Sequence, residues 1–135
     1  MNASTHKKVF TPAEANQTLP LVKMIVSDIV TLYKSVHDRQ GRLAIIRQRP
    51  GIQDREDSNV YSEELTQIEE ELNRDIERLE EYLEELKGIG VELKDPVKGL
   101  IDFRTMVEGR EAYLCWQLGE EEVLYWHELD SGFLG

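Results

Sequence analysis

The apolar residues of this chain follow a helical period in two long stretches and form shorter, strand-like runs near the C-terminus. In the first stretch they recur every three or four positions, and the positions are Val22, Ile25, Val26, Ile29, Leu32, Tyr33, Val36, Leu43, Ile45 and Ile46. This spacing is typical of the buried face of an α-helix. We therefore predict a first helical region over residues 11–49.

The start of this region carries a clear N-terminal signal. Thr11 is suited to the N-cap, Pro12 to the first helical position, and Glu14 to closing a capping box with Thr11. Pro20 interrupts the pattern, because an interior proline removes one backbone hydrogen bond. Two alternatives remain: one kinked helix, or a short helical turn followed by a new start near Thr18.

A second helix is predicted over residues 62–88, after a polar loop at residues 50–61. Its apolar positions run from Leu65 to Leu86, 21 residues in six steps, which is a mean spacing of 3.5. That spacing is typical of coiled coils. Gly88 or Gly90 is expected to end the helix in a left-handed conformation.

The remaining residues favour an antiparallel sheet over residues 91–128 and a tail at residues 129–135. The runs "VELKDP", "GLIDFRTMV", "EAYLCWQL" and "EEVLYWHE" contain many strand-forming residues. The predicted fold class is α+β: one domain, residues 1–135, in which a long antiparallel helical hairpin precedes a small three- or four-stranded antiparallel sheet.

A tight turn at Glu108 and Gly109 would fix the register of the first sheet hairpin. The facing pairs are then Val107 with Arg110, Thr105 with Ala112, Phe103 with Leu114, and Ile101 with Trp116. One face is apolar and packs on the helices. The other face carries Asp102, Arg104, Tyr113 and Cys115, with Asp102 opposite Cys115.

The register of the last strand decides which chemistry is available. A two- or four-residue loop around Gly119 and Glu120 puts His127 on the apolar side, whereas a three-residue loop puts it on the face of Asp102 and Cys115. In the second case Asp102, Cys115 and His127 could hold zinc or iron. Cys115 and His127 could also form a thiolate-imidazolium pair for nucleophilic catalysis, with Asp102 orienting the imidazole ring.

The plainer interpretation is a buried cysteine and a histidine that is satisfied by a neighbouring carboxylate. We favour it, because the chain contains no paired cysteine motif, phosphate-binding loop or nucleophile elbow. We expect no cofactor and no enzyme activity, with the metal site at Asp102, Cys115 and His127 as the alternative. The aromatic and acidic residues of the last strands are the candidate binding residues: Trp116, Glu120, Trp126, His127 and Glu128.

The net charge of -11 is unevenly distributed. Residues 1–60 sum to +3, residues 61–87 to -8 and residues 88–135 to -6. The cluster of arginines at positions 39, 42, 47, 49 and 55 is the one basic patch, and antiparallel helices would place its residues 39–49 beside the acidic residues 63–71. We therefore expect no nucleic-acid partner.

Composition and cysteine content favour a soluble cytoplasmic protein. Charged residues make up 32% of the chain, no apolar run is long enough for a membrane span, and no signal peptide is evident. A single cysteine cannot form an internal disulfide. Because two helices with one narrow seam bury little surface alone, we expect a homodimer or higher homo-oligomer through the helices. The ligand or protein partner remains open.

Several motifs together resemble an uncharacterised bacterial family, domain of unknown function 2203. They are "FTPAEAN" with the following "LP", "GLIDF", "EGR", "LCWQLGE" and "WHELDSGF". The resemblance covers nearly the whole chain. It implies that the block from Gly99 to Phe133 is the functional or assembly-defining half and that the helical hairpin is a scaffold.

Overall fold

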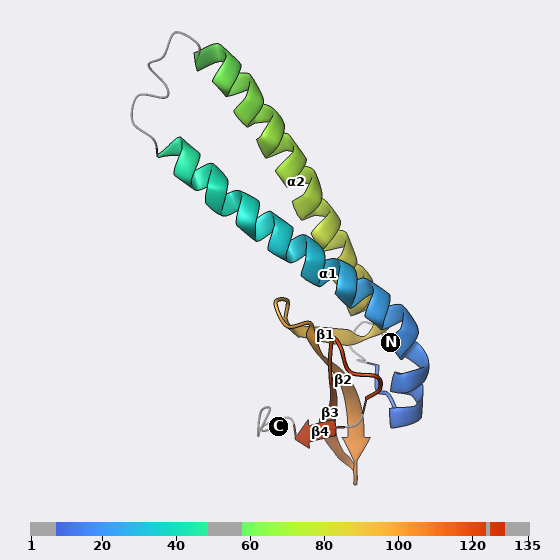
Figure 1. The fold of residues 1–135 in the computed structure, drawn as a ribbon. Helices are drawn as coiled ribbons and strands as arrows, with labels where there is room; N and C mark the ends of the chain where they lie inside the picture. The colour runs from blue at the N-terminus through green and yellow to red at the C-terminus, as the bar shows by residue number, and fades with distance from the viewer. Residues whose placement is uncertain (1–7, 49–57, 124, 129–135) are drawn as a thin grey trace.

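The protein is a long helical hairpin with a small antiparallel sheet near one end of it (Figure 1). The computed structural model describes residues 8–48, 58–123 and 125–128, with the side chains of residues 58–61 and 125–128 left out. The elements are α1 (Pro12–Arg47), α2 (Ser58–Ile89), β1 (Val91–Asp95), β2 (Leu100–Val107), β3 (Arg110–Gln117) and β4 (Tyr125–Glu128). The predicted α+β fold, a helical hairpin followed by an antiparallel sheet, is confirmed.

Helix α1 begins with the capping box that the sequence predicts. The Glu14 N–H donates to the Thr11 hydroxyl at 3.1 Å, and the Thr11 N–H donates to the Glu14 carboxylate at 2.9 Å. These bonds lower the pKa of Glu14. Pro20 lies inside a single helix, so the alternative of a new start near Thr18 is wrong. The first turns of α1 bend away from the rest (Figure 1), as expected at an interior proline.

Helix α2 begins at Ser58 and therefore starts before the predicted residue 62. The predicted loop at residues 50–61 was too long, since its last residues are helical; residues 50–57 lie outside the described part of the chain. The helix ends at Ile89, and Gly90 follows with a φ of +102°. Of the two glycines proposed to end the helix, Gly90 has the positive φ.

The four strands pair in sequence order, β1-β2-β3-β4, and all pairs are antiparallel. The turn between β2 and β3 is at Glu108 and Gly109, which have φ values of +51° and +80°. Every facing pair predicted from this turn is confirmed, from Val107 with Arg110 to Ile101 with Trp116. The two-residue turn fixes this register, and the alternation of apolar and polar side chains agrees with it.

The connection between β3 and β4 is longer than any of the predicted loops around Gly119 and Glu120. It covers residues 118–124, because the chain passes along α1 before it returns to the sheet. The Asn16 side chain holds this detour: its carbonyl oxygen accepts from the Val123 N–H at 2.7 Å, and its amide donates to the Val123 carbonyl at 3.4 Å. Lys23 also donates to the Glu121 carbonyl, at 3.1 Å. The hydrogen bonds from Asn16 thus keep this connection beside α1, and β3 and β4 are not joined by a short hairpin turn.

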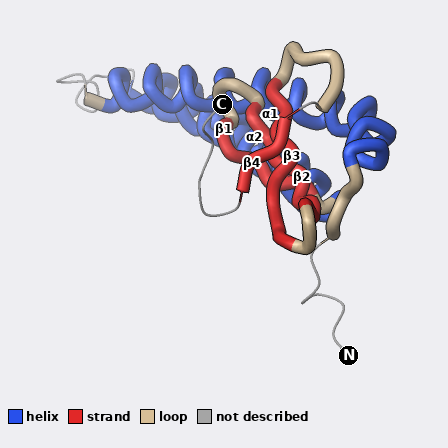
Figure 2. The backbone as a smooth tube through the Cα atoms, turned by 90° about the horizontal axis from the view of Figure 1, so that it is seen from below, coloured by secondary structure: helices blue, strands red, loops and turns tan. Residues whose placement is uncertain are grey.

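One face of the sheet packs on the first half of α1 and the last turns of α2, and this interface is the main core (Figure 2). Its largest fully buried side chains include Trp116, Phe10, Phe103 and Ile29. Beyond it, the helices continue as a pair without the sheet. We call this part, α1 from residue 32 and α2 up to residue 76, the distal hairpin. A smaller cluster of Val36, Leu43 and Leu72 is buried there.

Gly99, which precedes β2, should tolerate no side chain. Its φ is +70°, and an added Cβ would lie 2.7 Å from Leu118 Cβ and 3.1 Å from Val26 Cγ1. We expect Gly99→Ala to lower the free energy of unfolding by about 2–3 kcal/mol, from left-handed strain and overpacking together. Gly109→Ala is the matched control, because Gly109 has a φ of +80° but no atom within 4 Å of an added Cβ. Equal losses for the two variants in denaturant melts would contradict the packing argument.

Candidate functional site

The face of the sheet that points away from the helices carries the predicted polar residues. Asp102 on β2 pairs with Cys115 on β3, and Arg104 pairs with Tyr113, as the sequence predicts. Asp102, Tyr113 and Cys115 are nevertheless buried, with 3%, 7% and 5% of their surface exposed. The centre of this face is therefore not an open binding surface.

Tyr113 on β3 lies close to cationic side chains from β1 and β2. Lys94 Nζ is 5.4 Å from the centre of the ring, and the Arg104 guanidinium carbon is 5.6 Å from it. Arg104 also donates to the Tyr113 hydroxyl at 3.4 Å and forms an ion pair with Glu111 at 2.8 Å. Burial, followed by the charge of Glu92, raises the pKa of Tyr113, although both cations oppose the shift. The phenol is therefore neutral at physiological pH.

Lys94 is fixed by its neighbour Glu92, whose carboxylate lies 3.2 Å from the ammonium group. Burial lowers the pKa of Lys94, but the hydrogen bond and charge of Glu92, with the charge of Asp102, outweigh it and the net shift is upward. Lys94 consequently remains a cation. The outer face is thus mixed in charge, which differs from the acidic surface that we expected.

Cys115 is poorly suited to nucleophilic chemistry. Burial, then the charge of Asp102 and a hydrogen bond to its carboxylate, raises the pKa of the thiol to about 12. A nucleophilic cysteine needs the opposite shift, because the thiolate is the reactive form. Asp102 acts here on the thiol itself, whereas our catalytic hypothesis used it to orient the ring of His127.

The register of β4 determines the face on which His127 lies. Tyr113 pairs with His127 and Cys115 pairs with Tyr125, so the His127 position shares a face with Asp102 and Cys115. This is the face predicted for a three-residue loop, although the connection itself is longer. His127 is diagonal to Cys115 rather than opposite it, and diagonal neighbours are roughly 7–8 Å apart. For His127 the structure describes the backbone and not the side chain.

The predicted metal site finds no support in the described residues. No group of three or more His, Cys, Asp or Glu side chains among them could hold a metal ion. Asp102 and Cys115 supply two neighbouring groups, and the third predicted ligand, His127, is not among the described side chains. Zinc or iron at this position stays a prediction.

Of the candidate binding residues, Trp116 is part of the core. It has no exposed surface, and its indole N–H donates to the Glu120 carbonyl at 3.1 Å. The Glu120 carboxylate accepts from the Gln117 N–H at 2.6 Å. Both residues therefore stabilise the start of the connection after β3, and Trp116 cannot present its ring to a ligand. Trp126, His127 and Glu128 lie on β4, and their side chains are not described.

The arginine cluster of α1 finds acidic partners on α2, as the antiparallel arrangement predicts. Arg47 pairs with Glu69, and Arg39 pairs with Asp75. Arg49 and Arg55 lie outside the described residues. The paired arginines offer less positive charge to a nucleic acid than the sequence alone indicates.

Sequence reasoning missed a groove between the end of α2 and β1. It has a volume of about 660 Å³ and is lined by Lys8, Leu83, Leu86, Lys87, Gly88, Gly90, Val91, Glu92, Leu93, Lys94 and Arg104. Its four cationic residues come from four separate segments, so no run of basic residues marks it in the sequence. The sequence did contain a partial signal, since "VELKD" was predicted as a strand and any first strand of a sheet can be an edge strand.

The comparisons with known proteins agree with the motifs of the sequence. In the described part of the chain, neither helix is long and apolar enough to cross a membrane. No curated protein and no solved structure matches the chain. One family profile, that of an uncharacterized conserved protein (DUF2203), matches residues 8–135. Since the match covers nearly all of the sequence, from Lys8 onward, the chain belongs to the DUF2203 family, for which no biochemical function is defined.

Proposed function

We propose that the protein is a soluble, cytoplasmic scaffold that self-associates through the distal hairpin and binds a partner at its sheet end. The observation that carries this proposal is the incomplete burial of apolar side chains along the distal hairpin. Leu32, Leu65 and Ile76 are only partly buried there, and Ile68 is 39% exposed. A second copy would bury this stripe.

The helices are too long for the packing that one copy supplies. At about 1.5 Å per residue, the 36 residues of α1 extend for about 54 Å, and the sheet covers only one end of them (Figure 1). Helices in proteins derive most of their stability from the packing of an apolar face. In the distal hairpin that face meets only one other helix among the described residues.

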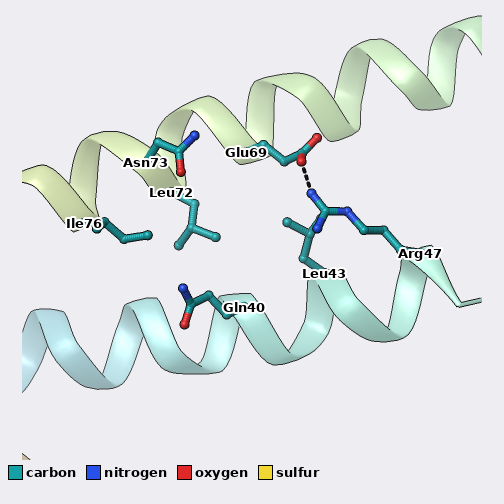
Figure 3. A pocket seen from close by; sticks show the side chains of 7 residues that line it. All are labelled: Gln40, Leu43, Arg47, Glu69, Leu72, Asn73 and Ile76. Carbon is teal, nitrogen blue, oxygen red and sulfur yellow. Dashed lines mark hydrogen bonds and ion pairs between the residues drawn. The ribbon is translucent and has the colours of Figure 1, made fainter.

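The seam between the two helices also contains a hollow of about 290 Å³, shown in Figure 3. Leu43 and Leu72 point towards each other across it, Ile76 lies beside them, and the Arg47–Glu69 pair closes one end. The polar side chains of Gln40 and Asn73 also line the hollow. Packing in the hairpin therefore lacks the density of a complete helical bundle.

Charge complementarity supports a second copy as the partner. The outer part of α1 carries Lys34 and Arg42 in addition to Arg39 and Arg47, which already pair with α2 of the same copy, whereas α2 between residues 63 and 85 is strongly acidic. In a two-fold symmetric dimer the same patch meets itself in reverse orientation, so α1 of each copy can face α2 of the other. Opposite charges would then meet at both halves of the interface, and a four-helix bundle would result.

A cytoplasmic location accords with the composition. The chain has one cysteine, which is buried as a free thiol, and 32% of its residues are charged. Disulfides persist mainly in oxidising compartments, and this cysteine has no partner within the sequence. The binding role is assigned to the sheet end because the groove beside β1 lies there.

Replacing Ile68 with lysine should dissociate the dimer without unfolding the monomer. Ile68 is partly exposed, and the new lysine would lie near Glu64 and Glu71 on the same helix face, which stabilises an isolated helix slightly. At a dimer interface the same charge would be desolvated, and we expect the dissociation constant to rise at least about tenfold, equivalent to about 1.4 kcal/mol.

The measurement is sedimentation velocity over a range of protein concentrations. Met24→Lys is the matched control, since Met24 is 67% exposed on α1 outside the distal hairpin. It should leave self-association unchanged. A monomer at all concentrations in the unmodified protein would refute the proposal.

A further inference from the structure

Strand β1 forms one edge of the sheet. It pairs with β2 from Val91 to Asp95, and no described strand pairs with its other side. In an antiparallel pair, alternate residues direct their N–H and C=O groups towards the neighbouring strand and the others direct them away. The free side of β1 therefore presents backbone groups that can pair with another extended chain.

The groove beside this edge has the shape that an added strand requires. Consecutive residues of β1, Val91 to Lys94, line one wall, and the last turns of α2, from Leu83 to Gly88, line the other. Four residues of extended chain span about 13 Å, at about 3.3 Å per residue.

The floor of the groove is apolar and continuous with the main core. Leu86 and Val91 are buried in that core, and Leu83 and Leu93 pack against it while remaining partly exposed. Side chains of an added strand alternate between two faces, so every second one would point towards this floor. Backbone hydrogen bonds would supply affinity, and the floor would select apolar residues at alternate positions.

The rim of the groove is cationic in a protein of net charge -11. Lys8, Lys87, Lys94 and Arg104 lie around it, and Glu92 is the one carboxylate among its lining residues. The C-terminal end of α2 adds a partial negative charge of only about one half. Lys94 and Arg104 already pair with Glu92 and Glu111, so Lys8 and Lys87 supply the net positive charge, which attracts an acidic segment and repels a basic one.

We propose that this groove binds an extended acidic peptide segment of a partner protein, which adds to the free edge of β1 as a further strand. The proposal rests on the binding role suggested above but not on self-association. The favoured segment alternates apolar and acidic residues, because its apolar side chains face Leu83 and Leu93 while its carboxylates lie near Lys87 and Lys94.

The test is a titration of the full-length chain, labelled with ¹⁵N, with a capped peptide of alternating valine and glutamate, about seven residues long. We expect millimolar binding, with the largest amide shifts at residues 91–94. Two matched peptides serve as controls. One has lysine in place of glutamate, and the other has alternate backbone amides methylated, which removes strand pairing but keeps the charge.

A pair of double variants tests the assignment to this groove. Lys87→Glu with Lys94→Glu should weaken binding at least tenfold. Arg78→Glu with Lys98→Glu changes the net charge equally, at exposed positions away from the groove lining and outside the distal hairpin, and should have a much smaller effect. Since Lys94 also contacts Tyr113, the spectrum of each variant without peptide is the check on its fold.

Three results would overturn the proposal. Equal binding of the methylated or basic peptide would show a contact without strand pairing or without charge selection. Shifts confined to residues outside the groove would place the peptide elsewhere. Shifts at residues 91–94 that depend on protein concentration without peptide would assign the edge to a second copy. Sedimentation of the same samples reports self-association separately, so either proposal can fail alone.

Discussion

Trp116→Ala is expected to lower the free energy of unfolding by about 3–5 kcal/mol, as is usual for a fully buried tryptophan. Trp116 belongs to the core between the sheet and α1, and its removal leaves a cavity that neighbouring strands cannot close without losing their register. The indole N–H also holds the Glu120 carbonyl, so the connection to β4 loses a hydrogen bond at its start. Urea denaturation followed by circular dichroism measures the loss.

The variant Trp116→Phe separates these two contributions. It retains an aromatic ring in the core but cannot donate to Glu120, and we expect a smaller loss of about 1–2 kcal/mol. Amide hydrogen exchange at residues 118–123 should become faster in both variants. A loss below about 1 kcal/mol for Trp116→Ala would mean that the ring does not fill the core.

Features that depend on residues close together in the sequence were predicted correctly. The capping box at Thr11 and Glu14 and the turn at Glu108 and Gly109 depend on residues only a few positions apart, and both are present. Once that turn was fixed, the alternation along β2 and β3 determined which residue faces which. Local geometry therefore accounts for the hairpin register without information from the rest of the fold.

The failures depend on contacts that are distant in sequence. The path of residues 118–123 depends on Asn16, which is 107 positions from Val123. No local rule relates an asparagine on the first helix to a loop near the C-terminus. The loop around Gly119 and Glu120 was therefore predicted too short, although the predicted face of His127 in one alternative agrees with the observed pairing.

Only part of the candidate site was predicted, because the rest of it also depends on contacts between residues that are distant in sequence. The pairing of Asp102 with Cys115 followed from strand register, and the buried cysteine that we favoured is confirmed, but the burial of Asp102 was not predicted. Trp116 was also named as a candidate binding residue, although the predicted register sets it opposite Ile101 on the apolar face that packs on the helices, and the structure shows it fully buried there. The groove beside β1 was missed, since its cations meet only when the end of α2, β1, β2 and Lys8 come together.

Because Cys115 is buried, we expect its thiol to react far more slowly in the folded protein than in the unfolded chain. The pKa of the thiol is raised from its ordinary value of 9.0 to about 12, so at pH 8 the thiolate fraction of the folded protein is about 1,000-fold below that of the unfolded chain. The thiolate is the form that attacks a disulfide reagent and releases its other sulfur as a thiolate. We therefore expect labelling of the folded protein at pH 8 to be at least about 1,000-fold slower than labelling in denaturant.

The same shift makes stability depend on pH in the alkaline range. Above about pH 9 the unfolded chain loses the Cys115 proton while the folded protein keeps it, so the unfolded state is favoured as the pH rises. The slope is at most about 1.4 kcal/mol per pH unit between pH 9 and 12. Since other groups titrate there, the contribution of Cys115 is the difference between the unmodified protein and Cys115→Ala, measured in denaturant melts from pH 8 to pH 10.5.

Two variants identify the cause of the protected thiol. Asp102→Asn removes the carboxylate charge and should speed labelling, yet labelling should stay slower than in the unfolded chain, because burial is the largest cause of the shift. Glu120→Gln should have a smaller effect, since its charge contributes least. A bound zinc or iron ion would instead hold Cys115 as a thiolate. Near-stoichiometric metal in protein purified without chelator, lost in His127→Gln, would contradict the protonated thiol and restore the predicted metal site at Asp102, Cys115 and His127.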